Sequence, residues 1–288
     1  MTGYTLKNDQ EIGDLIRGAT FLGTGGGGTP RIGYELLKME ADEGKKLAWI
    51  DPMEIPDDAW TATVTFMGNR APLSQEQEAL KVKIGLTRVK YEKNLVRAAQ
   101  ALEKYTGKKI KVIVAPEIGG ANIPGPMAAA LALGVPIVDG DYCGRAVPEI
   151  AQSLPCIAGK PILPIVSVDK WGNICIIEES VNHAATERIG KMLAMAAFGN
   201  TGLAGFLLRG SEMKALVIKR TFTECLRLGE AIRKARENGK DPVAASIQFC
   251  KGWLLFRGRV REKEWNVIDG YYCGFHTVDG IEDFEGHR

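Results

Sequence analysis

The chain has 288 residues, of which 45% are hydrophobic and 25% are charged, a composition typical of a folded globular protein. At this length two domains are expected rather than one. Lys and Arg total 37 against 35 for Asp and Glu, so the sequence has no basic surplus of the kind that recruits nucleic acid.

The compartment follows from three further features. The apolar stretches are too short, or too interrupted by Gly and Pro, to cross a bilayer. The N-terminal residues lack the basic stretch and apolar run of a secretory signal. The six cysteines stand singly, which indicates reduced thiols and excludes a zinc site built from four thiolates. We therefore expect a cytoplasmic protein.

The first third of the chain predicts a helix, a glycine loop and a second helix. Apolar residues at helical spacing predict a helix that begins at residue 8 or 9 and ends near 22. Glycines fill most of positions 23–28. Thr29 as a cap and Pro30 as first helical residue then predict a helix that ends between residues 39 and 42.

The middle of the chain predicts a compact βαβ unit. Strands at 47–50 and 61–67 and a helix at 93–105 lead into it. The unit itself consists of an apolar strand at 110–115, a loop at 116–125, a helix at 126–133 closed by Gly134, and a second apolar strand at 135–138. Runs this apolar suit strands covered on both faces, as in a parallel sheet.

The second half of the chain predicts a change of architecture. Strands at 162–168 and 174–178 flank a Trp-Gly-Asn turn and resemble a β-hairpin. The further predicted elements are helices at 181–198 and 221–238, a strand at 216–219, and strand-like sequence from 253 with a late strand at 271–278. We predict an N-terminal α/β domain at 1–162, with a parallel or mixed sheet and flanking helices. A more β-rich α+β domain follows at 163–288.

Polar side chains follow both strands of the βαβ unit. Ligands bind at the carboxyl ends of parallel strands, so the loops after residues 115 and 138 should face each other. These loops supply Glu117, Asn122, Asp139, Asp141, Arg145 and Glu149. In the functional interpretation the two Asp residues bind a divalent ion or orient a water, while Arg145 and Asn122 hold a polar edge of the substrate. In the alternative, Arg145 pairs with Glu149 or Asp141 and only locks its loop.

The glycine run is the second candidate site. Gly23, Gly25 and Gly28 match Gly-x-Gly-x-x-Gly, but the dinucleotide fingerprint requires a preceding strand, and a helix is predicted there. Backbone N–H groups of Gly25, Gly26, Gly27 and Gly28, leading into a helix, are suited to bind an anion or a developing oxyanion. The alternative is a tightly packed turn. A nucleotide-binding enzyme is a second functional hypothesis, favoured if the segment before Gly23 is a strand.

Two further residues have open interpretations. His183, in the first turn of a predicted helix, is either structural or a ligand that reaches across from the second domain. Cys143 lies in the acidic loop and is an alternative nucleophile, although no histidine stands near it in the sequence.

Three motifs resemble one family. Residues 22–28 (LGTGGGG), 117–122 (EIGGAN) and 139–149 (DGDYCGRAVPE) are together similar to the S-methyl thiohydantoin desulfurase family. The resemblance implies a two-domain α/β enzyme that hydrolyses a cyclic S-alkylated thiourea, releasing a thiol and leaving a hydantoin, with zinc or another divalent metal. It also implies a further segment beyond residues 279–280, so we expect the C-terminal domain to be truncated.

These arguments give each residue an expected role. Asp139, Asp141 and His183 are the expected metal ligands, and Glu117 takes or relays a proton. The amides of residues 25–28 bind an oxygen, and Asn122, Arg145 and Glu149 fix the ring. The family's setting also suggests a hydantoinase- or oxoprolinase-like protein partner, and hence the hypothesis of a non-catalytic partner subunit. We further expect a homo-oligomer.

Overall fold

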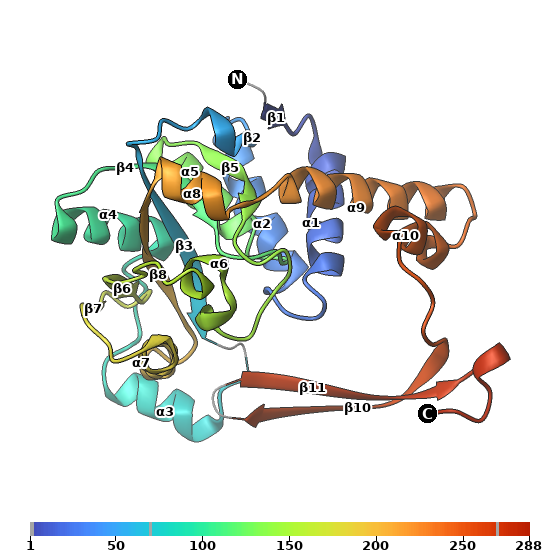
Figure 1. The fold of residues 1–288 in the computed structure, drawn as a ribbon. Helices are drawn as coiled ribbons and strands as arrows, with labels where there is room; N and C mark the ends of the chain where they lie inside the picture. Colours follow the sequence, from blue (N-terminus) through green and yellow to red (C-terminus); the bar gives the residue numbers. More distant parts are fainter. Residues whose placement is uncertain (1–2, 69–70, 269–270) are drawn as a thin grey trace.

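A mixed nine-stranded sheet forms the centre of the fold (Figure 1). The computed structural model describes residues 3–68, 71–268 and 271–288. Neighbouring strands follow the order β1-β2-β5-β4-β3-β8-β6-β7, and β9 pairs with β5. Their bounds are β1 (Gly3–Thr5), β2 (Ala48–Ile50), β3 (Trp60–Gly68), β4 (Ile110–Ala115), β5 (Ile137–Asp141), β6 (Ile165–Val168), β7 (Ile174–Ile177), β8 (Asn200–Arg209) and β9 (Ile218–Lys219).

The sheet is mixed, with four parallel strands flanked by antiparallel ones, including β1 beside β2 and β9 beside β5. Strands β2, β5, β4 and β3 run parallel to one another, while β8, β6 and β7 continue the sheet in antiparallel pairs. The predicted βαβ unit is confirmed, with α5 (Pro124–Leu133) as the crossover between β4 and β5. The predicted hairpin is confirmed as β6 and β7. Strands on both sides of residue 163 thus share one sheet.

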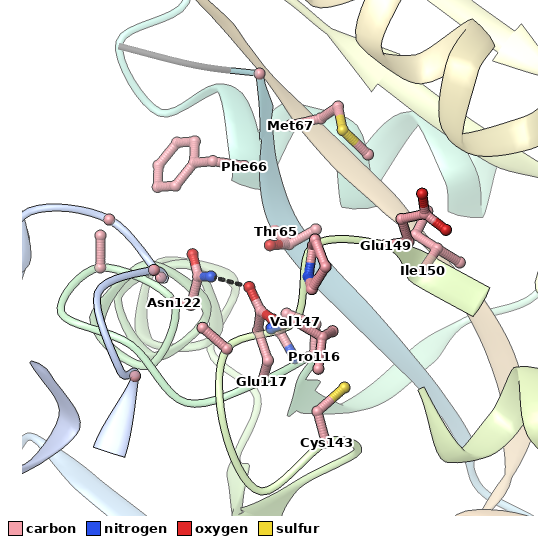
Figure 2. Close-up of a pocket in the computed structure, with 18 of the residues that line it drawn as sticks. Thr65, Phe66, Met67, Pro116, Glu117, Asn122, Cys143, Val147, Glu149 and Ile150 are labelled. Atoms are coloured by element: carbon pink, nitrogen blue, oxygen red, sulfur yellow. Dashed lines mark hydrogen bonds between the residues drawn. The ribbon is translucent and has the colours of Figure 1, made fainter. Parts of the chain in front are cut away.

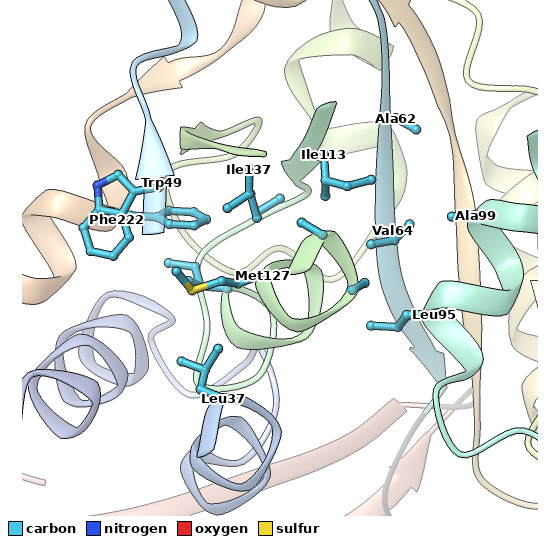
Figure 3. Packing of buried hydrophobic residues seen from close by; sticks show 14 of the residues in the cluster. Leu37, Trp49, Ala62, Val64, Leu95, Ala99, Ile113, Met127, Ile137 and Phe222 are labelled. Atoms are coloured by element: carbon cyan, nitrogen blue, oxygen red, sulfur yellow. The ribbon is translucent and has the colours of Figure 1, made fainter. Parts of the chain in front are cut away.

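Helices cover both faces of the sheet. Those of the chain are α1 (Asp9–Leu22), α2 (Pro30–Asp42), α3 (Gln75–Lys83), α4 (Asn94–Thr106), α5, α6 (Leu154–Ile157), α7 (His183–Ala196), α8 (Gly210–Leu216), α9 (Thr221–Glu237) and α10 (Pro242–Cys250). None of the helices among the described residues is long and apolar enough to cross a membrane. Leu37 of α2, Leu95 of α4, Met127 of α5 and Phe222 of α9 pack on one face of the sheet (Figure 3).

Strand β4 is buried on both sides, as its apolar run predicts. Ile113 packs into the cluster of Figure 3, while Val112 and Val114 pack into a second cluster with Met213 of α8. The covering of both faces explains why the strand does not alternate between apolar and polar residues. The predicted α/β class with flanking helices is therefore confirmed.

The helix–glycine–helix prediction is also confirmed. Helix α1 is capped by Asn8, whose side chain accepts a hydrogen bond from Glu11 N at 3.0 Å. Helix α2 begins at Pro30, although the Thr29 side chain makes no capping hydrogen bond. The segment before Gly23 is thus a helix, which is the outcome that disfavours dinucleotide binding by the glycine run.

A long hairpin completes the chain. Strands β10 (Gly258–Ile268) and β11 (Tyr271–Gly280) form a separate antiparallel sheet, with Trp265 opposite Gly274. In Figure 1 the hairpin leaves α10 and runs back beneath the large sheet toward the end of β3. Most of its residues are exposed. This hairpin sheet is separate from the nine-stranded sheet, to which the other strands of the predicted 163–288 domain, β6 to β9, belong.

Candidate active site

The loops that follow β4 and β5 meet, as the topology of the βαβ unit predicts. The backbone N–H of Tyr142 donates to Pro116 O at 3.2 Å. The backbone N–H of Val147 donates to Oε2 of Glu117. A side chain from the first loop is thereby fixed to the backbone of the second, and Figure 2 shows Glu117 and Val147 side by side.

The glycine run packs by its backbone against the first of these loops. The N–H groups of Ala121 and Asn122 donate to Gly27 O at 2.8 and 3.1 Å. Gly27 has φ +77, and a Cβ there would lie 2.4 Å from the Cα of Gly119. By contrast, a Cβ at Gly25 would meet nothing within 4 Å. Close backbone approach therefore explains Gly27, as in the tight-turn interpretation, while Gly25 stands at an open surface.

These three segments surround one cavity of about 850 Å³. This volume is within the range of small-molecule sites. The polar and charged side chains that line it are Thr20, Thr24, Thr29, Thr63, Thr65, Glu117, Asn122, Tyr142, Cys143, Arg145, Glu149, Ser153, Glu187, Lys191, Asn200, Tyr271, Tyr272 and Cys273. All glycines of residues 23–28 also line it. The cavity thus collects most of the predicted site residues.

Glu117 is the most perturbed acid in the cavity. Its Oε1 accepts a hydrogen bond from Asn122 Nδ2, and its Oε2 accepts one from Val147 N (Figure 2). Burial, with smaller contributions from the negative charges of Asp141 and Glu187, raises the pKa of Glu117 to about 7 against the lowering effect of the two hydrogen bonds. At neutral pH this carboxyl therefore exchanges readily between its acid and base forms.

The remaining predicted substrate ligands lie at the cavity but differ in exposure. Asn122 is buried, with its amide turned to Glu117. Arg145 is exposed, and its Nε donates to Ala146 O at 2.9 Å. Within the described part of the chain Arg145 forms no ion pair with Glu149 or Asp141, so the loop-locking interpretation finds no support. The exposed Glu149 accepts a long hydrogen bond from the hydroxyl of Tyr271 at 3.5 Å.

Asp139 caps a helix. Its Oδ1 accepts from the backbone N–H groups of Phe222 and Thr223 at 2.9 and 3.1 Å, and its Oδ2 accepts from the Thr223 hydroxyl. Arg220, the residue before α9, has φ 69 and makes no capping hydrogen bond of its own. A carboxylate from β5 thus satisfies the first N–H groups of α9 and interacts favourably with the helix dipole.

Asp141 is turned into its own loop. Its Oδ1 accepts from Cys143 N and Gly144 N at 2.7 and 2.6 Å. Burial raises the pKa of Asp141 to about 6, against the lowering effect of these donors and of the Thr221 hydroxyl. Burial, together with the charges of Glu117 and Asp141, also raises the pKa of the Cys143 thiol. Cys143 is therefore held as the neutral thiol, which is a weak nucleophile.

The three expected metal ligands do not form a donor set. Among the described residues that line the cavity, Asp139, Asp141 and His183 are absent. The Oδ1 atoms of Asp139 and Asp141 accept from separate backbone donors, and His183 begins α7. The described ranges contain no group of three or more His, Cys, Asp and Glu side chains placed to hold a metal ion. The residues present therefore do not fit the divalent metal that the family resemblance implies.

Two charged cavity residues were not predicted. Glu187 and Lys191 line the cavity from α7, and their side chains pair at 3.1 Å. In the sequence this is an ordinary Glu–Lys pair at a spacing of four residues on a helix, which usually faces solvent. The available signal was weak: the pair lies on the same helix face as the small residues Gly190 and Ala194, which are buried.

Comparison with known proteins agrees with this architecture. The family model described as the S-Me-THD-like N-terminal domain matches residues 10–179, and the S-Me-THD-like C-terminal domain matches residues 181–288. A search of curated proteins finds no match. The crystal structure of a protein from Chromobacterium violaceum is similar, with a TM-score of 0.70 and 20% sequence identity over 99% of this chain and 76% of that chain. At this identity the likeness shows a shared fold. With both domain models matched in order along nearly its whole length, the chain belongs to the S-Me-THD-like family, that of the S-methyl thiohydantoin desulfurases.

Proposed function

We propose that this chain hydrolyses the carbon–sulfur bond of a small cyclic S-alkyl isothiourea of the thiohydantoin type, releasing a thiol and leaving a hydantoin. The family suggests thiohydantoin desulfurase activity. The observation that carries the hydrolytic chemistry is Glu117, a carboxyl with a pKa raised to about 7 that lines the cavity. A general base works best when its pKa lies near the operating pH.

Glu117 is also oriented for this task. An ionised carboxylate has about four lone-pair sites, and the donors on Asn122 and Val147 occupy two of them. The sites that remain are free to accept a proton from water. In the proposal Asn122 holds the base in place, instead of binding the ring as the sequence suggested.

The first step is the addition of water. Glu117 takes a proton from the water while the oxygen of that water bonds to the ring carbon that carries sulfur. The π electrons of the carbon–nitrogen double bond move to the ring nitrogen, which then receives that proton from Glu117. Backbone N–H groups of residues 25–28, together with Arg145, are the proposed donors to the polar edge of the ring. No step is assigned to a metal, because the donor set does not fit one.

The experiment is a thiol-release assay on an S-methyl thiohydantoin with the purified chain, followed with a thiol-reactive chromophore at pH 8. Wild-type protein should release one thiol per hydantoin formed. Elemental analysis of the same sample, with and without prior treatment by a chelator, measures the metal content. Absence of thiol release by the folded wild-type chain would overturn the proposed function.

A further inference from the structure

Helix α7 places a buried ammonium group at the cavity. Lys191 lines the cavity, and its side chain is 11% exposed. Its Nζ lies 3.1 Å from Oε1 of Glu187 and 3.1 Å from the ring centroid of Tyr271. Within the described residues, Nζ has no hydrogen-bond partner.

Such an ammonium group is costly unless it meets an acceptor. Lysine is almost never fully buried without a partner, and its three N–H donors lose their water on burial. The ion pair with Glu187 balances the charge, and the face of Tyr271 is favourable to a cation. Neither contact accepts a hydrogen bond from Nζ. The donors of Lys191 are thus left for a group that occupies the cavity.

Glu117 and Lys191 are connected through one short segment of chain. Val147 N donates to Glu117, and Ile150 N donates to Oε2 of Glu187 at 3.0 Å. Glu187 in turn pairs with Lys191. Each end of this four-residue segment is therefore fixed to a carboxylate: Glu117, the proposed base, at one end, and Glu187, the ion-pair partner of the ammonium, at the other. This arrangement holds both groups at the same cavity, although they come from the two different family domains.

We propose that Lys191 is the proton donor to the departing sulfur in the desulfurase reaction. The inference rests on the proposed function, because it assigns the second step of that reaction. After water has added, the carbon–sulfur bond breaks and its electron pair goes to sulfur, which takes a proton from Lys191. The hydroxyl on the ring carbon becomes the carbonyl, and its proton returns to the Lys191 amine. Of the two protons of water, one thus ends on the ring nitrogen and one in the thiol.

The test compares two leaving groups on the same ring. An alkyl thiolate is a poor leaving group and needs a proton, whereas a nitrophenyl thiolate departs without one. For Lys191→Met we expect kcat on the S-methyl substrate to fall by about 10²–10⁴-fold, the usual contribution of a general acid. On the S-nitrophenyl substrate the fall should be less than about 10-fold, since only that contribution is lost.

Two further variants distinguish the loss of the proton donor from the loss of the positive charge and from an effect on folding. Lys191→Arg keeps the cation beside Glu187, but a guanidinium does not give up its proton, so the S-methyl substrate should again be slow. Arg188→Met removes an exposed cation from the same helix, away from the described cavity lining, and should leave both substrates unaffected. If Lys191→Met does not fold, Lys191→Arg still carries the comparison.

The outcomes distinguish this inference from the function on which it rests. Wild-type turnover of both substrates establishes the reaction by itself. Equal losses on both substrates in the Lys191 variants, or full S-methyl turnover by Lys191→Arg, overturn the role of Lys191 and leave the proposed function standing. If the wild-type chain releases thiol from neither substrate, both fall.

Discussion

Replacing Glu117 by Gln should lower activity and should remove the loss of stability that the wild-type protein shows as the pH rises. Burial raises the pKa of Glu117 from 4.5 to about 7, which corresponds to about 3 kcal/mol at 1.36 kcal/mol per pKa unit. The folded protein therefore binds more protons at this site than the unfolded chain between pH 4.5 and about 7. Stability contributed by the site is present at low pH and is lost as the pH rises through this window. Gln has no proton to lose, so the variant should lack this loss.

The measurement is urea unfolding of both proteins at pH 5 and pH 8. Relative to wild type, Glu117→Gln should gain about 2–3 kcal/mol between the two values. A pH-independent cost of about 1 kcal/mol lowers the stability of the variant at both pH values and cancels from this difference, because the amide NH₂ of Gln faces a donor where the carboxylate accepted a hydrogen bond. In the thiol-release assay at pH 8 the variant should lose about 10²–10⁴-fold in kcat/KM, the range for a general base.

The matched control is Glu92→Gln. Glu92 is exposed and lies outside the described cavity lining, so the same change of charge should alter neither activity nor the pH dependence of stability. Wild-type kcat/KM should rise with pH through about 7 as Glu117 ionises. The reasoning is refuted if Glu117→Gln keeps wild-type turnover, or if its free energy of unfolding follows the wild-type pH dependence.

Three other changes test neighbouring features. Asn122→Ala removes a hydrogen bond that lowers the pKa of Glu117, so the midpoint of the kcat/KM profile should move above that of wild type; an unchanged midpoint contradicts this. Asp139→Ala leaves the first N–H groups of α9 unpaired and should cost about 1–3 kcal/mol in urea unfolding, while Asp139→Asn, which keeps an acceptor, should cost less. Gly27→Ala should lower stability by more than about 2 kcal/mol, because its Cβ meets backbone at 2.4 Å; Gly25→Ala, strained only by its φ of +98, should cost about 1 kcal/mol, and equal costs would contradict the packing argument.

Local sequence patterns are sufficient to predict those parts of the fold that depend on residues close together in the sequence. The βαβ unit follows from two apolar runs, an intervening helix and a left-handed C-cap at Gly134. The meeting of its two loops then follows from the rule that parallel strands end at one edge of a sheet. For this reason the sequence alone predicts that Glu117 lies where the two loops meet.

Strand β8 shows where local patterns fail. It contains Gly202 and Gly205, and glycine is depleted in strands, so the sequence of this segment indicates a loop. Both glycines are explained by distant contacts. A Cβ at Gly202 would lie 2.9 Å from the backbone of Asn94, and one at Gly205 would lie 2.8 Å from a side-chain carbon of Ile165. Glycine is therefore needed at these two positions of the strand because α4 and β6 approach it closely.

The same limit applies to Asp139 and Asp141, which the sequence places in the loop after the second strand of the βαβ unit and the structure places inside β5. In the sequence, Asp139 and Asp141 come after an apolar run. From the sequence alone they could be either metal ligands or structural groups. The partner that decides for Asp139 is the start of α9, about eighty residues further along the chain. No spacing within the loop reveals it, because the start of α9 is brought to Asp139 by the pairing of β9 with β5. A carboxylate after a buried strand is thus as good a candidate for capping a remote helix as for chemistry.

The burial of Lys191, in the second family domain, also depends on a residue that is distant in sequence. On its own helix it is one member of a Glu–Lys pair, and nothing in the sequence separates it from the solvated pairs of α9. Its burial depends on Tyr271 at the start of β11, eighty residues away, whose ring lies against the ammonium. By covering the Lys191 ammonium, the hairpin changes it from a surface cation into a desolvated proton donor. If Lys191 protonates sulfur, shortening the Tyr271 side chain to Ala should rehydrate the ammonium and slow the S-methyl substrate more than the S-nitrophenyl substrate, even though the Lys191 side chain itself is unchanged.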